Sequence, residues 1–92
     1  MHVEIVSPEA TLYSGEISSV TAPGTDGSFQ VLSAHAPLVA ALGAGEIKIQ
    51  GVERLQGEQA SRFTSVGQGA YSLSIQSGTL EVKNNTIIVL AD

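Results

Sequence analysis

Apolar and polar residues alternate along almost the whole chain, and this period of two constrains the fold more than any other feature. Successive side chains of a β-strand point to opposite faces of a sheet, so each alternating run predicts a strand with one buried face. Such runs occur around residues 3–5, 29–31, 47–49, 71–75 and 80–82. No stretch carries a helical period, and the sequence therefore predicts an all-β protein.

Turn-forming residues separate these runs. Asn84-Asn85 between two strand-like runs predicts a tight hairpin, because asparagine tolerates a positive φ angle. Many short strands with frequent turns indicate a sandwich or a barrel. The apolar run at residues 87–90 breaks the alternation and predicts a strand covered on both faces. The glycine-rich segment from Val52 to Gly69 has no clear period, and we interpret it as a long hairpin with a mobile tip.

The size and charge of the chain restrict its function. Ninety-two residues predict a single domain over residues 1–92, with too little buried volume for a large private cavity. The net charge of −5 and the four scattered cations exclude the basic stripe that nucleic acid requires, and they argue against anionic lipid. Only 14% of residues are charged, which suggests that part of the surface faces a partner. With no long apolar stretch and no basic leader, we expect membrane contact only through another protein.

The chain offers little for catalysis or for binding a cofactor. Neither lysine follows a glycine, so a phosphate-binding loop is absent, and Gly43 and Gly45 are interpreted as turn residues. There is no cysteine, and the two histidines, His2 and His35, have no metal-site spacing. The serines, His35 and Asp26 lack the sequence context of a nucleophile. We therefore expect no catalytic residue, no metal and no cofactor.

An ordered set of short motifs gives the chain a family resemblance. Its most specific parts are Pro23-Gly24-x-x-Gly27, then Val31-Leu32-x-x-His35-Ala36-Pro37-Leu38, and later Ser77-Gly78-x-Leu80-Glu81-Val82. Read in order, they resemble the N-terminal domain of the epsilon subunit of F-type ATP synthases, the equivalent of the mitochondrial delta subunit. The resemblance covers the whole chain.

The resemblance implies a flattened β-sandwich of two roughly five-stranded, mainly antiparallel sheets. It also implies a non-catalytic central-stalk (rotor) subunit of a proton- or sodium-translocating enzyme, which couples rotation of the c-ring to ATP synthesis. The expected partners are the gamma subunit and the c-ring, at the cytoplasmic face of a bacterial inner membrane rather than a plastid thylakoid. The residues that match the gamma-facing part of the family are Ser7, His35, Ala36, Pro37, Leu38 and Ala40. Those that match the loop approaching the c-ring are Asp26, Gly27, Ser28 and Phe29.

The sequence departs from the family pattern in three places. Ser28 stands where many relatives have a carboxylate, which puts a specific ion pair with the ring in doubt unless Asp26 supplies the charge. The segment from Val52 to Gly69 is longer than expected. The sequence stops at Asp92, where most relatives begin a helical hairpin, so the inhibitory and ATP-binding activities of that hairpin are not assigned. We expect a naturally short form rather than a trimmed one.

Two other classes of function compete with this interpretation. One is a β-sandwich module that binds a ligand or a peptide. Such modules usually display aromatic platforms, whereas this chain has no tryptophan and only four other aromatic residues, of which Tyr71 is expected to point inward. The other is a small enzyme with sites between subunits, for which only His35, Asp26 and surface glutamates would be available.

Overall fold

The computed structural model describes residues 1–33, 36–53, 55 and 60–92. Within these residues the chain forms strands joined by short turns, and its one helical element is the single 3-10 turn η1 (Ala60–Arg62). The strands are β1 (His2–Val6), β2 (Thr11–Glu16), β3 (Ser19–Gly24), β4 (Gly27–Leu32), β5 (Leu38–Leu42), β6 (Gly45–Gln50), β7 (Thr64–Gly67), β8 (Ala70–Ile75), β9 (Gly78–Lys83) and β10 (Thr86–Ala91). The prediction of an all-β protein is confirmed.

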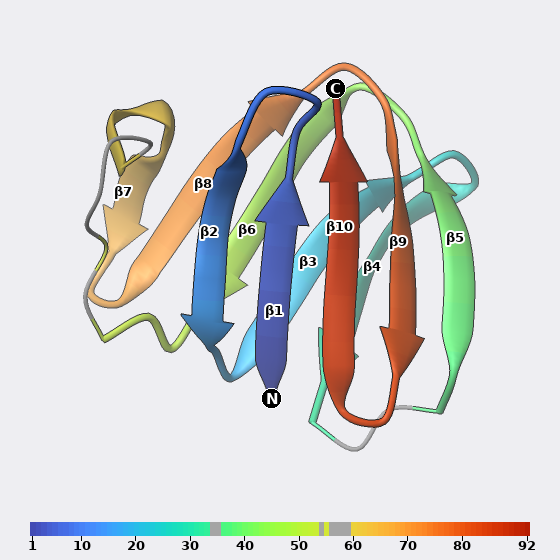
Figure 1. The fold of residues 1–92 in the computed structure, drawn as a ribbon, viewed down its shortest axis with the longest axis horizontal. Coiled ribbons are helices and arrows are strands. Elements are labelled where there is room, and N and C mark those ends of the chain that lie inside the picture. Colours follow the sequence, from blue (N-terminus) through green and yellow to red (C-terminus); the bar gives the residue numbers. More distant parts are fainter. Residues whose placement is uncertain (34–35, 54, 56–59) are drawn as a thin grey trace.

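The strands form two layers (Figure 1). The front layer has the order β2-β1-β10-β9-β5, and the back layer has the order β4-β3-β6-β8-β7. A single residue pair between β3 and β5, Gly24 with Leu42, joins the two layers. All pairings are antiparallel except that of β1 with β10. The flattened, mainly antiparallel sandwich of two five-stranded sheets is therefore as expected.

The alternating residues build the core between the layers. Each strand turns its apolar side inward, so that branched aliphatic side chains from both layers meet. The largest side chains that are essentially fully buried are Ile5, Ile47, Ile49, Leu80, Ile87, Val3, Val20, Val31, Val82 and Val89. Tyr71 packs against this core, in agreement with its predicted inward position.

The hairpin between β9 and β10 turns at Asn84 and Asn85, whose φ angles are 52° and 58°. Both angles lie in the left-handed region that a two-residue turn of this hand requires, so the predicted tight hairpin is present. Gly43 and Ala44 connect β5 to β6, and Gly45 is the first residue of β6, so the predicted turn position is confirmed for Gly43 and is wrong for Gly45.

The segment from Val52 to Gly69 differs from the long hairpin that its sequence suggested. Its described part contains η1 and then β7, which pairs with the following strand β8 rather than within the segment. Phe63 lies between these elements and packs its ring edge-on against Tyr13 of β2, with 6.4 Å between the ring centroids. This contact joins the two layers along one side of the sandwich. Residues 54 and 56–59 of this segment lie outside the described residues, so the predicted mobile tip stays a prediction.

The last strand is covered on one face only within this chain. Ile87 and Val89 are fully buried between the layers, whereas Ile88 and Leu90 point outward and are 37% and 53% exposed. The prediction of cover on both faces is therefore wrong for the chain by itself. In the part that the structure describes, no helix has the length and hydrophobicity to span a bilayer.

Candidate functional site

The predicted ring-facing residues occupy the hairpin between β3 and β4. Asp26, Gly27 and Ser28 are exposed there, and Phe29 is half-buried against the core. Gly27 has a φ angle of 124°, a backbone conformation that side chains with a Cβ atom rarely adopt. The tip of the hairpin thus presents one carboxylate, on Asp26, and very little bulk.

Two backbone hydrogen bonds attach this hairpin to the end of β5. The Thr25 N–H donates to the Ala41 carbonyl at 3.0 Å, and the Gly43 N–H donates to the Pro23 carbonyl at 2.8 Å. Both bonds flank the residue pair that joins the two layers. The hairpin is therefore held against the front layer and is not an isolated loop.

The predicted gamma-facing residues separate into two groups. Ala36 and Pro37 are exposed before β5, and Leu38 and Ala40 are half-buried on it. Ser7 lies after β1, at the opposite end of the front layer from the start of β5 (Figure 1). His35 lies outside the described residues. The described members of this set are therefore not brought together at one point, and Leu38 and Ala40 lie on the inner side of β5, opposite to Val39.

Ser7 is a turn residue. Its side chain is buried. Its hydroxyl accepts a hydrogen bond from the Ala10 N–H and donates one to the Ala10 carbonyl, each at 3.2 Å. The Ser7 N–H donates to the same carbonyl at 2.8 Å. These contacts fix the turn between β1 and β2 at this end of the front layer.

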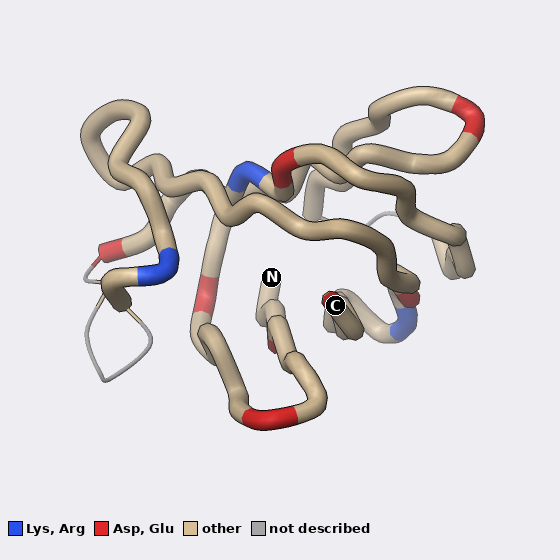
Figure 2. The backbone as a smooth tube through the Cα atoms, turned by 90° about the horizontal axis from the view of Figure 1, so that it is seen from above, with Lys and Arg blue, Asp and Glu red and all other residues tan. Residues whose placement is uncertain are grey.

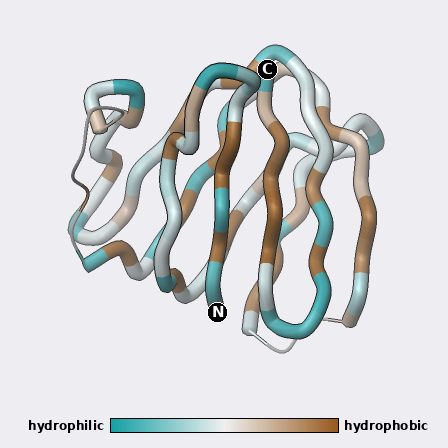
Figure 3. Tube along the Cα trace, viewed as in Figure 1, coloured by the Kyte–Doolittle hydropathy of each residue, from teal (hydrophilic) through white to brown (hydrophobic). Residues whose placement is uncertain are grey.

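The outer face of the front layer carries exposed apolar side chains. Val39 on β5 is 74% exposed, and Ile88 and Leu90 on β10 are 37% and 53% exposed. The strand registers place them in two rows across the layer. One row is Val6, Leu90, Thr79 and Ala41, and the other is Glu4, Ile88, Glu81 and Val39. Figure 3 shows a long hydrophobic stretch along β10, which matches the unbroken apolar run at 87–90. We call this surface the front face.

The outer face of the back layer is polar by comparison. One row across it is Gln30, Thr21, Lys48 and Ser72, and the next is Leu32, Ser19, Gln50 and Ala70. The Ser19 hydroxyl donates to the Gln50 side-chain carbonyl at 3.1 Å. Leu32, 54% exposed, is the one large apolar side chain in these two rows. We call this surface the back face.

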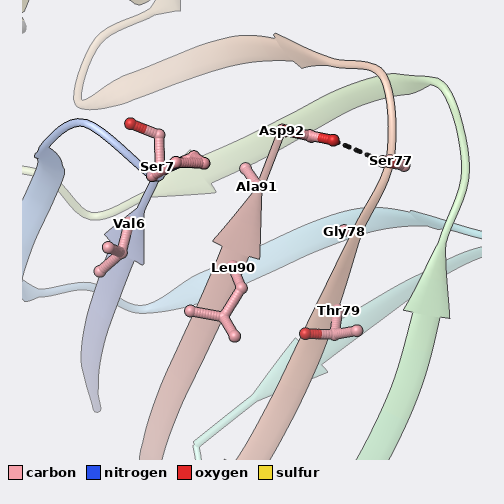
Figure 4. Close-up of a pocket in the computed structure, with 9 residues that line it drawn as sticks. Val6, Ser7, Ser77, Gly78, Thr79, Leu90, Ala91 and Asp92 are labelled. Carbon is pink, nitrogen blue, oxygen red and sulfur yellow. Dashed lines mark hydrogen bonds between the residues drawn. The ribbon is translucent and has the colours of Figure 1, made fainter.

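Two grooves border the front face. The first, of about 660 Å³, lies beside Ser7 and the chain end and has a mainly apolar lining (Figure 4). The Ser77 hydroxyl reaches the Asp92 carboxylate across it at 3.5 Å. The second, of about 540 Å³, lies between the β3–β4 hairpin and β5. It brings Asp26 and Phe29 of the predicted ring-facing set together with Leu38 and Ala40 of the predicted gamma-facing set.

Charged groups are few and scattered over both layers (Figure 2). The closest cluster joins His2 to Glu16, with His2 Nδ1 3.3 Å from Glu16 Oε2 and the terminal ammonium 3.2 Å from Glu16 Oε1. The hydrogen bond from that ammonium holds the pKa of Glu16 below its ordinary value. Among the described residues, no three His, Cys, Asp or Glu side chains gather in a way that could hold a metal ion.

Sequence reasoning missed Val39, Ile88 and Leu90 as surface residues. The signal was present, because the alternation fails in the unbroken apolar runs at 38–42 and 87–90. A continuous apolar strand is covered on both sides in a finished structure. The sequence alone did not show that Ile88 and Leu90 are exposed in the part of the chain that the structure describes.

Comparison with known proteins gives one consistent family. The family described as "ATP synthase, Delta/Epsilon chain, beta-sandwich domain" matches residues 1–92. An ATP synthase epsilon chain of Leptospira borgpetersenii is 38% identical over 92 residues, which cover all of this chain and 61% of that protein. An ATP synthase epsilon chain of Chlorobium limicola is 34% identical over 90 residues, covering 98% of this chain and 86% of that protein.

Solved structures share the fold at low sequence identity. A chain from the central stalk and c-ring of the Tetrahymena thermophila mitochondrial ATP synthase aligns with a TM-score of 0.72 at 18% identity, covering 99% of this chain and 62% of that chain. A chain from the Euglena gracilis mitochondrial ATP synthase gives 0.71 at 14% identity, with 97% and 48% covered. This chain spans about three fifths of the length of the first curated relatives that it matches.

Proposed function

The chain belongs to the family of ATP synthase delta/epsilon chains through their β-sandwich domain, and we propose that it is a non-catalytic rotor subunit of the central stalk. In this role it holds the foot of the gamma subunit and rests on the c-ring, so that rotation driven by protons or sodium ions reaches the catalytic head. It works at the cytoplasmic face of the bacterial membrane and contacts that membrane only through the complex.

The observation that carries this proposal is the front face. An exposed apolar surface on a small domain marks a place where a partner binds. Ile88 and Leu90 of β10 and Val39 of β5 are exposed on this face, with Glu81 and Thr79 of β9 between them. Ser7 and Pro37 lie at opposite ends of the same layer, and we assign gamma to this face, although Leu38 and Ala40 lie on the inner side of β5. His35 and Ala36 belong to the same proposed interface by their place in the sequence.

The ring contact is assigned to the β3–β4 hairpin. Its tip is exposed, small and acidic, and two hydrogen bonds to the end of β5 hold it in place. A rigid, small tip suits contact with the polar loops of a rotating ring, because it transmits force without large side chains to reorder. Asp26 supplies the charge that Ser28 lacks.

The first test is a calorimetric titration of this chain with the gamma subunit from the same source. Saturable one-to-one binding is the expected result. If gamma does not bind at high micromolar concentration, the stalk role is contradicted.

A further inference from the structure

Strand β4 forms an open edge of the back layer. It pairs with β3 along its full length, from Gly27 with Gly24 to Leu32 with Ser19. Among the described residues it pairs with no other strand. One side of its backbone therefore has its ladder hydrogen bonds, and the other side faces outward.

The groups that face outward follow from the hydrogen bonds of β3. The Pro23 carbonyl accepts from Gly43, on the side of β3 away from β4. The residues of a strand alternate in the side to which their N–H and C=O groups point. Pro23 opposes Ser28 in the β3–β4 register. The backbone groups of Ser28, and by alternation those of Gln30 and Leu32, thus point to the open edge.

This edge lacks the features that normally keep strand edges apart. Natural proteins protect edges with charged side chains, proline, bulges or very short strands. From Gly27 to Leu32 there is no charged residue and no proline, and the register with β3 is regular. The other back-layer edge, β7, has four residues and an irregular register, and the front-layer edge β2 has an irregular register and carries Glu16. Edge β5 is partly closed by its pairing with β3.

We propose that β4 pairs antiparallel with β4 of a second copy of this chain, about a two-fold axis at Gln30. In this register Gln30 opposes Gln30 of the second copy, and Ser28 opposes Leu32 in both directions. Every outward N–H and C=O of these three residues then finds a partner, because all the opposed pairs are of the hydrogen-bonded type.

The side chains of β4 are compatible with pairing to a second copy. The strand carries no charge, so two copies place no like charges opposite each other. Leu32, which is 54% exposed, gains cover beside Ser28 of the second copy. The contact is isologous and closes on itself, so it gives a dimer and not a fibre. It buries little surface, which predicts a weak and reversible dimer.

The pairing has a consequence for assembly. Ser28 and Phe29 belong both to this edge and to the loop proposed to face the ring. A paired subunit must therefore separate before it enters the stalk. This consequence rests on the proposed function, whereas the pairing itself does not.

Cysteine cross-linking tests the register, because the chain contains no cysteine of its own. In the Gln30→Cys variant the two sulfur-bearing residues face each other, with Cα atoms about 5.5 Å apart, within the range of a disulfide. In the Ser28→Cys variant they lie four residues apart along the strands, about 13 Å, and cannot bond. Under mild oxidation Gln30→Cys is expected to form a covalent dimer, and Ser28→Cys only when mixed with Leu32→Cys. Equal cross-linking of Gln30→Cys and Ser28→Cys, or none for Gln30→Cys, would overturn the proposal.

Sedimentation of the unmodified chain between about 10 µM and 1 mM tests the association itself, in the range typical of small, weak interfaces. The average mass is expected to rise with concentration. Gln30→Lys places two ammonium groups side by side and is expected to weaken the dimer at least about tenfold. Ser74→Lys, at an exposed position on β8 away from the edge, is the matched control and should leave it unchanged. A chain that stays monomeric at 1 mM, or equal weakening by both substitutions, would contradict the pairing.

Discussion

The two outer faces of the sandwich are built from the same kind of strand and yet differ in character. The front face carries Ile88 and Leu90 on β10 and Val39 on β5, with Glu81 and Thr79 of β9 between them. The rows of the back face carry mainly hydroxyl and amide side chains with Lys48, and the exposed apolar residues of the back layer, Leu32 and Val66, lie on its two edge strands. The apolar side chains that build the core come from the inward sides of both layers. We attribute the difference between the outer faces to the proposed binding of gamma.

The largest expected effect is the difference in the free energy of unfolding between replacing an inward leucine and replacing an outward leucine of the front layer. Leu80 is fully buried and Leu90 is 53% exposed. Leu80→Ala removes packed methyl groups from the core and should lower the free energy of unfolding by about 2–5 kcal/mol. Leu90→Ala should change it by less than about 0.5 kcal/mol. Urea unfolding of both variants measures the difference, and a similar loss for both would mean that the front face serves folding.

The next effect is a difference in gamma binding between a substitution on the front face and one on the back layer. Leu90→Glu places a charge where the proposed gamma interface excludes water, and should weaken gamma binding at least about tenfold, or about 1.4 kcal/mol. Val66→Glu is the matched control, because Val66 on β7 of the back layer is 48% exposed, close to the 53% of Leu90. It should leave gamma binding unchanged. Calorimetry on both variants decides, and weaker binding by Val66→Glu alone would move the interface to the back face.

A smaller effect on stability is expected at Ser7, in the turn between β1 and β2. Ser7→Ala removes the hydroxyl that contacts the Ala10 N–H at 3.2 Å. The loss of this hydrogen bond should lower the free energy of unfolding by about 1 kcal/mol. Thermal unfolding measures it, with Ser74→Ala at an exposed position of β8 as the control. If Ser7→Ala weakens gamma binding without any loss of stability, Ser7 contacts the partner directly.

The smallest expected effect is a pH dependence of stability that comes from Tyr13. Burial, and then the charge of Glu16, raise the pKa of Tyr13 above its ordinary value of 10.0. The folded state thus holds this proton more tightly than the unfolded state, so stability is lost as the pH rises above about 10. Between pH 9 and 11 the unfolding midpoint of the native chain should fall more than that of Tyr13→Phe. An equal fall in both would show that Tyr13 belongs to the solvated surface.

Much of the fold followed from local rules in the sequence. The alternation at Ile47 and Ile49 predicted both the strand and the side that points inward, because a period of two fixes both. Asn84 and Asn85 set a turn through their tolerance of positive φ. The segment around Phe63 was not predictable in the same way, because its place depends on a ring contact with Tyr13, about fifty residues away in sequence. Contacts of that range leave no local period.

The candidate site was less predictable than the fold. The motif around Pro37 pointed to one part of the molecule, and Ser7 to another, without showing that an apolar face lies between them. That face arises only when β10, β9 and β5 align in register. The exposed tip at Asp26 and Gly27 was visible in the sequence, because glycine-rich turns between alternating runs are hairpin tips. Its attachment to the end of β5 was not.

The most direct test is the methyl NMR spectrum of this chain, with the side chains of Val, Ile and Leu labelled, before and after addition of gamma. The methyl signals of Val39, Ile88 and Leu90 report on the front face, and those of Val66, 48% exposed on β7, report on the back layer. We predict that the front-face signals shift or broaden on binding while those of Val66 stay in place. Shifts at Val66 with an unchanged front face would contradict the assignment of gamma to the front face.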